Sequence, residues 1–288
     1  MTPPLDSRHI RHAFGRAARS YVQHAALQRE VEDQLLERLD YVERVPQRLL
    51  DLGCGPGRAS SVLRKRWKSA HVIALDLALP MLRQVRPGWR RPLTRVCADA
   101  CALPLPDASI DVLFSNLCIQ WIDELPALFD EWRRVLRPGG YVAFSTFGPD
   151  TLHELRSAWA SADRAPHVSQ FADIARIGDA LLAAGFRDPV LDADRFTLHY
   201  ADAASLMREL KAIGATNADA RRARGLTGKA QFRRALDAYE SFRDNGALPA
   251  TYEVISAHAW GPEAGQPRRS RGAEVASFPV DKLRGSRR

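Results

Sequence analysis

Glycine and carboxylate residues gather in one short segment, Asp51-Leu52-Gly53-Cys54-Gly55-Pro56-Gly57. Glycines let the backbone turn tightly and approach a ligand closely. Their G-x-G-x-G spacing differs from the G-x-G-x-x-G of dinucleotide-binding proteins and from the phosphate-binding loop that ends in G-K-[ST]. With the Asp51 carboxylate beside it, the loop suits a positively charged ligand better than a pyrophosphate. The alternative is a tight turn without a ligand, because structural glycine turns are common.

Three further polar residues follow predicted strands in the same way. Asp76 ends the second strand, 19 residues after Gly57, and an acid about 20 residues beyond such a loop can accept hydrogen bonds from both ribose hydroxyls. Asp99 follows the third strand and Asn116 the fourth. Each acid alone suits a helix cap equally well. Because strand carboxyl ends form the ligand crevice of an open α/β sheet, we expect these residues to meet at one edge.

Strands and helices are predicted to alternate around these positions. Short apolar runs predict seven strands, at 48–52, 71–75, 93–97, 110–115, 141–146, 190–200 and 252–260. Helical periodicity or composition covers 10–40, 58–67, 80–85, 125–136, 174–184 and an Arg-rich stretch at about 203–245. Arg137-Pro138-Gly139-Gly140 is predicted to break the chain between a helix and a strand. This order predicts a doubly wound, mostly parallel α/β sheet with a helical insertion before its last strand.

Residues 45–200 resemble the class I S-adenosylmethionine-dependent methyltransferases, which have a Rossmann-like fold. The resemblance implies that the glycine loop (Gly53, Gly55, Gly57, with Asp51) borders the methionine part of S-adenosylmethionine. It further implies that Asp76 holds the ribose, that Asp99 meets the adenine amino group, and that Leu77 and Ala100 flank the adenine. Asn116 is expected at the same site.

A closer resemblance, to the malonyl-acyl-carrier-protein O-methyltransferases, extends over nearly the whole chain. Five segments carry it in order: HAFGRAA with Tyr21 and QHAALQ at 12–28, SNLCIQW at 115–121, FSTFGP at 144–149, LKAIGATN at 210–217 and LTG at 226–228. The tail after Trp260 departs from the pattern. This family moves a methyl group from S-adenosylmethionine to the free carboxylate of malonyl-thioester on acyl carrier protein, the step that opens biotin synthesis.

The reaction that the resemblance implies needs no general base, because a carboxylate is already ionised at pH 7. The protein must instead hold the reactants in line and exclude water. A cation or polar group is expected to orient the carboxylate, and the candidates are Arg156, His167, Tyr21 and Gln120. Tyr21 is expected to close over the cofactor from an amino-terminal helix. We expect no metal, because no His/Cys cluster has zinc-ligand spacing.

Composition sets the domain organisation and the compartment. The 288 residues are 45% hydrophobic and 26% charged, which is typical of a globular protein. We predict a helical lid at 1–45, a methyltransferase domain at 46–260 and a disordered basic tail at 261–288. Without an apolar run long enough to span a membrane or a signal sequence, the default compartment is the cytoplasm. The four cysteines (Cys54, Cys97, Cys101, Cys118) are expected to be reduced and mostly buried.

The net charge of +8 suggests an acidic partner. Residues 203–245 hold nine basic and five acidic residues, and the tail holds seven and three. Acyl carrier proteins are acidic, so we hypothesise that the 203–245 insertion is a lid and a carrier-docking surface, with Arg221 and Arg222 as test positions. The alternative is that these charges form an ordinary solvated helix face without a partner.

Two other functions remain open at this stage. One is a quinone-type small-molecule methyltransferase, which would need a base such as His12, His24 or His167. The other is a nucleic-acid-binding protein that uses its basic surface, although no RRM-like or helix-turn-helix pattern is found.

Overall fold

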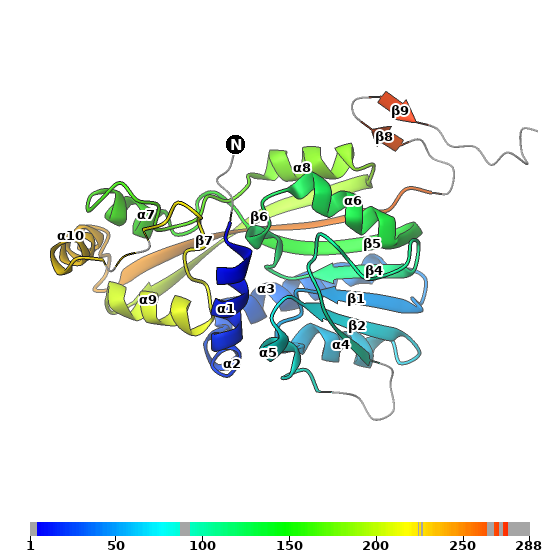
Figure 1. Cartoon of the computed structure of the whole chain (residues 1–288), viewed down its shortest axis with the longest axis horizontal. Helices are drawn as coiled ribbons and strands as arrows, with labels where there is room; N and C mark the ends of the chain where they lie inside the picture. The colour runs from blue at the N-terminus through cyan, green and yellow to red at the C-terminus, as the bar shows by residue number, and fades with distance from the viewer. Residues whose placement is uncertain are drawn as a thin grey trace, which may run out of the picture.

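A seven-stranded sheet runs through the centre of the protein in the computed structural model (Figure 1). Its strands are β1 Arg48–Leu52, β2 His71–Asp76, β3 Leu93–Cys97, β4 Ile110–Ser115, β5 Leu136–Phe147, β6 Arg187–Tyr200 and β7 Leu248–Trp260. Their order is β3-β2-β1-β4-β5-β7-β6, with β1 to β5 parallel and β7 antiparallel to both neighbours. The structure describes residues 5–86, 93–223, 225, 227–263, 268–270 and 273–275.

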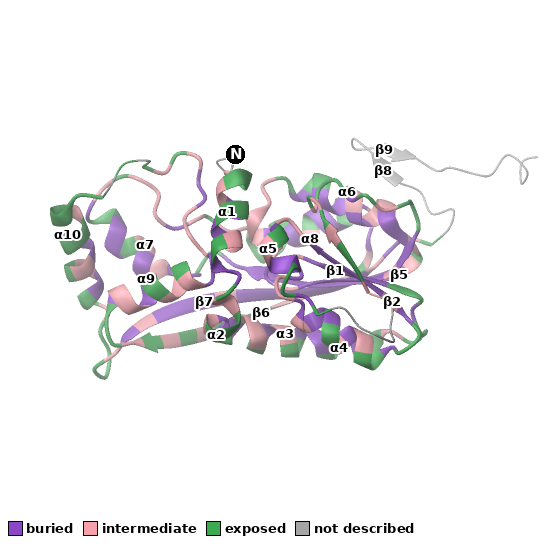
Figure 2. Ribbon diagram, turned by 60° about the horizontal axis from the view of Figure 1, so that its bottom comes forward, coloured by how far each residue is buried: buried purple, intermediate pink, exposed green. Residues whose placement is uncertain are grey.

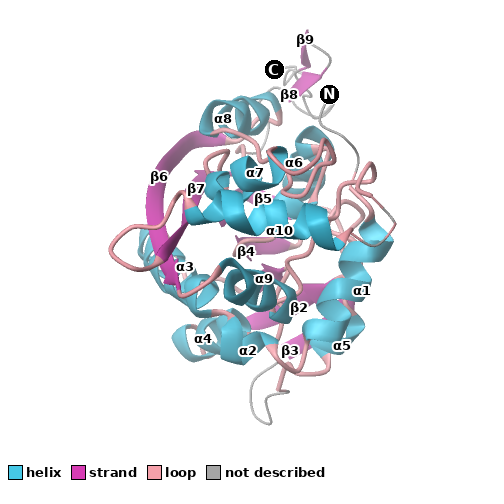
Figure 3. Ribbon diagram, turned by 90° about the vertical axis from the view of Figure 1, so that its left-hand side faces the viewer, coloured by secondary structure: helices cyan, strands magenta, loops and turns pink. Residues whose placement is uncertain are grey.

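The central strands are apolar on both sides because helices cover both faces of the sheet (Figure 3). The helices are α1 Ser7–Ala17, α2 Tyr21–His24, α3 Ala26–Glu37, α4 Arg58–Arg66, α5 Leu79–Leu82, α6 Leu125–Val135, α7 His153–Ala160, α8 Ile174–Ala183, α9 Ala203–Ala212 and α10 Lys229–Glu240. On one face, α6 and α8 bury Phe129 and Trp132 against the sheet. On the other, α3 and α4 bury Leu35 and Leu63. The predicted mostly parallel, doubly wound fold is confirmed.

The chain reverses its direction of travel across the sheet between β1 and β4. It builds β1, β2 and β3 toward one edge and then returns to place β4 on the other side of β1. Such a switch point opens a crevice at the carboxyl ends of the strands, where ligands of α/β proteins bind.

The strands β6 and β7 extend well beyond the end of β5 (Figure 2). The pairing of β5 with β7 ends at Phe147 and Val254, whereas β6 and β7 remain paired as far as Tyr200 and Leu248. The helices α7, α9 and α10 pack on this extension around a core of their own, which includes the fully buried Leu206. The helical insertion is therefore an integral lobe that shares the two longest strands of the sheet.

Two local predictions differ from the structure. The periodic stretch at 10–40 is three helices, since the backbone departs from helical geometry at Ala25 and turns between α1 and α2. No Pro or Gly marks these breaks. The predicted breaker Arg137-Pro138-Gly139-Gly140 lies inside β5 as an irregularity, because β4 pairs first with Leu136 and then with Tyr141.

The cysteines are free, and burial separates them: Cys54 is buried and Cys118 partly so, but Cys97 and Cys101 are exposed. The expectation that they are mostly buried is therefore wrong, because β3 is an edge strand. The predicted disorder of 261–288 falls largely outside the described residues. Of that segment, β8 Arg268–Ser270 and β9 Ala273–Val275 pair antiparallel. No helix in the described part of the chain is long and apolar enough to cross a membrane.

Candidate functional site

A cavity of about 380 Å³ lies at the carboxyl ends of β1 to β4, at the switch point of the sheet. We call it the main cavity. The residues that line it from the strand ends are Gly53, Gly55, Asp76, Leu77, Asp99, Ala100 and Asn116. The start of the chain and α1 cover it with Leu5, Ser7, Ile10 and Phe14. A volume of this size falls within the range of small-molecule and cofactor sites.

The glycine loop takes its shape from left-handed backbone angles. Gly53 has φ +70° and Gly55 has φ +52°. A Cβ on Gly53 would lie 2.4 Å from the Cys118 sulfur, whereas one on Gly55 would meet no atom within 4 Å. Gly57 does not line the main cavity, and its missing Cβ leaves room for Val85. The loop therefore presents backbone, without side chains, to the cavity.

Backbone N–H groups fix both acids at the rim of the main cavity. The N–H of Gly55 donates to Asp76 Oδ2 at 2.9 Å, and that of Ala78 donates to Oδ1 at 2.8 Å. Burial raises the pKa of Asp76, and these two hydrogen bonds oppose the rise. The N–H of Cys101 donates to Asp99 Oδ1 at 2.9 Å. Each carboxylate oxygen retains lone pairs that can accept from a ligand.

A smaller pocket of about 70 Å³ adjoins the main cavity and shares Tyr21, Gly53, Gly55 and Asn116 with it. Its charged lining residues are Asp51, Glu32, Arg29 and Arg58, and Arg58 is paired with Glu32. We call it the acidic pocket. Asp51 is 2% exposed and accepts a hydrogen bond from the Ser60 hydroxyl.

Negative charge accumulates around Asp51. Burial raises its pKa to about 7, and the nearby carboxylates of Glu32 and Asp76 add to the rise. Within the described part of the chain Asp51 forms no ion pair. Glu32 accepts from Arg58 at 2.6 Å, yet its pKa is still raised by burial. A cationic ligand group would be stabilised here.

A third, narrow space adjoins the main cavity on the side of α6 and α8, and its volume is about 40 Å³. We call it the side cavity. Its polar lining comes from Gln120, Thr146, Ser169, Gln170, Arg176, Asp123 and Asp219. Asp123 lines both cavities: Oδ2 accepts from the N–H of Leu5 at 2.7 Å, while the buried Oδ1 has no partner among the described residues. Apolar residues such as Ile119, Phe171 and Ile177 make up the rest of the lining, so the side cavity is mixed in character.

The four predicted orienting residues lie in different places. Tyr21 lines the main cavity and the acidic pocket, where burial raises the pKa of its hydroxyl. Gln120 lines the side cavity and donates to the Leu117 carbonyl at 2.6 Å. The His167 ring stacks on that of Trp159, with 3.8 Å between the ring centroids, and it hydrogen-bonds Asp163. His167 is not among the residues that line these three spaces.

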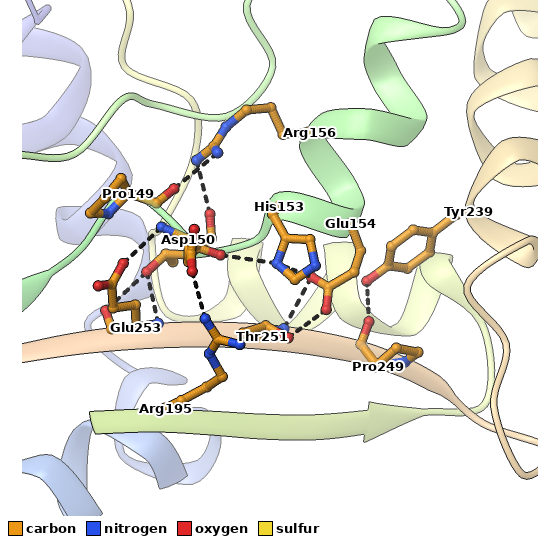
Figure 4. A network of polar contacts seen from close by, with 11 residues as sticks. Pro149, Asp150, His153, Glu154, Arg156, Arg195, Tyr239, Pro249, Thr251 and Glu253 are labelled. Carbon is orange, nitrogen blue, oxygen red and sulfur yellow. Dashed lines mark hydrogen bonds and ion pairs between the residues drawn. The ribbon is translucent and has the colours of Figure 1, made fainter. Parts of the chain in front are cut away.

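Arg156 hydrogen-bonds the backbone just before the start of α7 (Figure 4). Its guanidinium donates to the carbonyls of Pro149 at 3.0 Å and Thr151 at 2.9 Å, away from the lining residues. In the same network the buried Glu154 accepts from the N–H and the hydroxyl of Thr251 on β7. The Glu154–Thr251 contacts anchor α7 to β7, and the Arg156 guanidinium stabilises the turn that leads into α7.

The histidines that a quinone-type enzyme could use as a base also lie elsewhere. His12 is exposed on α1, and His24 hydrogen-bonds the Ser20 carbonyl. Among the described residues, no histidine lines the main cavity, the acidic pocket or the side cavity.

Some lining residues were not predicted as site residues. Phe14 lies in the HAFGRAA segment but was given no role there, and Ile10 looks like an ordinary apolar position of an amphipathic helix; both line the main cavity. Glu32 lies on α3, one turn before the core residue Leu36, and reaches the glycine loop only through the fold. Asn116 holds α3 in place, because its Nδ2 donates to the Gln28 carbonyl at 2.9 Å.

Arg222 links the insertion to the start of the chain, because it pairs with Asp6 at 3.0 Å. Arg221 pairs within the insertion, with the buried Asp219 at 3.1 Å. The N–H of Asp6 also donates to the Ala218 carbonyl at 2.8 Å. Charge reversal at Arg222 would place two like charges at this link, so a loss of activity there would not report docking alone.

Known proteins resemble this chain over nearly its whole length. Residues 50–144 match the family described as "Methyltransferase domain". The malonyl-acyl-carrier-protein O-methyltransferase of Xylella fastidiosa is 51% identical over 97% of this chain and 96% of its own length. That of Halorhodospira halophila is 48% identical over 99% and 97%.

Solved structures support the fold alone. A structure described as that of a methyltransferase from Bacillus halodurans aligns with a TM-score of 0.57, 15% identity and coverage of 80% of this chain and 98% of its own. The YcgJ protein of Bacillus subtilis aligns with a TM-score of 0.55, 15% identity and the same coverage. The near-complete match to the curated relatives decides the family: this chain belongs to the malonyl-acyl-carrier-protein O-methyltransferases.

Proposed function

We propose that this protein transfers a methyl group from S-adenosylmethionine to the free carboxylate of a malonyl-thioester carried on acyl carrier protein, the reaction that opens biotin synthesis. One observation carries the proposal: the curated malonyl-acyl-carrier-protein O-methyltransferases match over 97% and 99% of the chain, so the match includes α1 and the insertion as well as the methyltransferase domain. The geometry of the site supports it.

The described residues fit S-adenosylmethionine along its length. Asp76 lies where an acid can accept from ribose hydroxyls, and Asp99, Leu77 and Ala100 surround the space expected for the adenine. The acidic pocket suits the ammonium group, because Asp51 is a buried carboxylate without a cationic partner in the described chain. When bound, this donor supplies a methyl group made electrophilic by the sulfonium.

The chain's own contribution is positioning and exclusion of water. The acceptor carboxylate is ionised at pH 7, so no protein group has to remove a proton. Ile10 and Phe14 of α1 cover the main cavity with apolar surface, and we assign α1 to α3 the role of a lid that keeps water out. Tyr21 and Gln120 remain our candidates for orienting the acceptor, since both line a cavity at the site. A quinone-type reaction receives no support, because the lining of the site lacks a histidine among the described residues.

Incubation with labelled S-adenosylmethionine and malonyl-, succinyl- and acetyl-carrier proteins tests the function. We expect label on the malonyl form alone, released by alkali as an ester requires. The acetyl form controls for carrier labelling without a free carboxylate. Absence of label on every carrier, with donor binding intact, would refute the proposal.

A further inference from the structure

The helix α1 has two chemically different sides. Ser7, Ile10 and Phe14 line the main cavity, and Ala13 and Ala17 are buried. The opposite side carries Arg8, Arg11, His12 and Arg16, all of them exposed. Their spacing of three to four residues places these side chains on one helical face. One short helix therefore covers the ligand site with its inner side and presents cations to solvent with its outer side.

The cations of this outer side are not neutralised within the described chain. Arg8, Arg11, Arg16 and the neighbouring exposed Arg19 form no ion pair with any described residue. We call these four residues the α1 basic face. Asp6 is the sole acidic residue between residues 5 and 20, and it forms an ion pair with Arg222 rather than with a residue of this face.

The basic residues of the insertion are partly paired. Arg221, Arg222 and Arg243 form ion pairs, with Arg243 bound to Glu240 at 2.7 Å. Lys211, Lys229 and Arg233 are exposed and form no ion pair with a described residue, and they are distributed over α9 and α10. On α1, in contrast, three unpaired arginines lie on a single helix of 11 residues whose inner side lines the main cavity.

The position of α1 places the basic face close to the main cavity. The helix lies at the carboxyl ends of the parallel strands, next to α5 and between the sheet and α9 (Figures 1 and 3). His9 hydrogen-bonds Thr216 at 3.0 Å, and Ser20 donates to the Ala212 carbonyl at 2.7 Å, so both ends of α1 are fixed to the insertion. A partner seated on α1 would be close to the main cavity without displacing either lobe.

We propose that the α1 basic face is the docking surface for the acidic carrier protein that delivers the acyl substrate, an assignment that rests on the proposed function. Opposite charge on the two surfaces accelerates encounter and orients the partners. A carrier bound here would be separated from the main cavity only by α1, whose inner side lines that cavity.

The test is a charge-reversal variant, Arg8→Glu/Arg11→Glu. Negative charge in the first turns of a helix is favourable, so the helix itself is not weakened. The matched control is Arg44→Glu/Lys68→Glu, two exposed cations without an ion pair in the described chain, in loops that lead into the amino ends of β1 and β2. Calorimetry with S-adenosylhomocysteine verifies that both variants retain the donor site.

Two measurements report docking. One is kcat/KM for the malonyl carrier at low and at high salt, and the other is binding of a fluorescent malonyl carrier to enzyme loaded with S-adenosylhomocysteine. We expect the α1 variant to lose about tenfold or more in both at low salt, with the difference shrinking at high salt. The control should stay within twofold of the wild type.

The outcomes separate docking from function. If the wild type methylates the malonyl carrier and the α1 variant matches the control, the docking surface lies elsewhere although the function stands. If the wild type methylates no carrier, the proposed function fails first. A competition experiment with polyuridylate tests the alternative that the face binds nucleic acid. If polyuridylate displaces the carrier from the wild type, and the α1 variant loses RNA binding while its carrier binding is unchanged, the face binds nucleic acid and the docking proposal is wrong.

Discussion

Replacing Asp51 by Asn should make the unliganded protein more stable and a poorer binder of the methyl donor. The side chain is 2% exposed and close to two other carboxylates, and its hydrogen-bond partner is the Ser60 hydroxyl. An Asn has nearly the same shape and retains a carbonyl oxygen for Ser60. The substitution therefore removes the buried charge with little change in packing.

The magnitude follows from the pKa. Folding raises the pKa of Asp51 from 3.8 to about 7, and a shift of roughly three units corresponds to about 4 kcal/mol of destabilisation when the carboxylate is ionised. The new amide N–H groups need partners, so we expect a net gain of about 1–3 kcal/mol at pH 8. Because the folded-state pKa is raised, the contribution of Asp51 to stability is fully present below about pH 4 and is lost as the pH rises through about 7. The difference between variant and wild type should thus grow from pH 4 to 7 and then level off.

Urea unfolding of both proteins at pH 5 and pH 8 measures the stability difference. Calorimetric titration with S-adenosylmethionine should show donor binding weakened by about 10–100-fold, as expected from the loss of one charge-assisted hydrogen bond. Donor binding to the wild type near pH 6 should also release a proton, seen as a buffer-dependent binding enthalpy. An Asn variant that is less stable than the wild type at pH 8, or that binds the donor equally well, would refute the reasoning.

Four further substitutions test the site and the lid. Asp76→Ala should weaken donor binding by about 10²–10⁴-fold, because two hydrogen bonds to a carboxylate are lost; an unchanged dissociation constant in calorimetry would remove Asp76 from the site. Gly53→Ala should cost about 2–4 kcal/mol in urea unfolding, since it combines a left-handed φ with a clash. Gly55→Ala, which meets no neighbour, should cost only about 1–2 kcal/mol, and equal costs would contradict the packing argument. Arg222→Met should change the free energy of unfolding by no more than about 1 kcal/mol, because the lost ion pair with Asp6 is partly exposed. It should accelerate proteolysis near Asp6, at the start of α1, because the ion pair no longer fixes this segment. An unaltered digestion rate would mean that the pair does not anchor α1.

The sequence alone determined the order of elements and the edge of the sheet where the site lies. Apolar runs in β1, β2 and β4 and the periodicity of α6 are local patterns, and local patterns suffice to specify strands buried on both faces and an amphipathic helix. The positions of Asp76 and Asp99 after their strands followed directly, since carboxyl ends of parallel strands share one edge. The glycines at 53 and 55 likewise predicted a tight turn, which the structure forms with left-handed backbone angles.

Tertiary structure decided which distant groups meet, because the energy of a contact depends on partners that no local pattern specifies. Arg222 pairs with Asp6, which lies 216 residues away along the chain, and no local pattern distinguishes it from a free surface cation. The same holds for Glu32 beside Asp51. Tertiary structure also decided that the amino-terminal segment forms three helices. The helix α1 covers the main cavity, whereas α3 packs on the sheet. The apolar periodicity of the sequence runs through both helices and could not show that they bury their apolar sides against different surfaces.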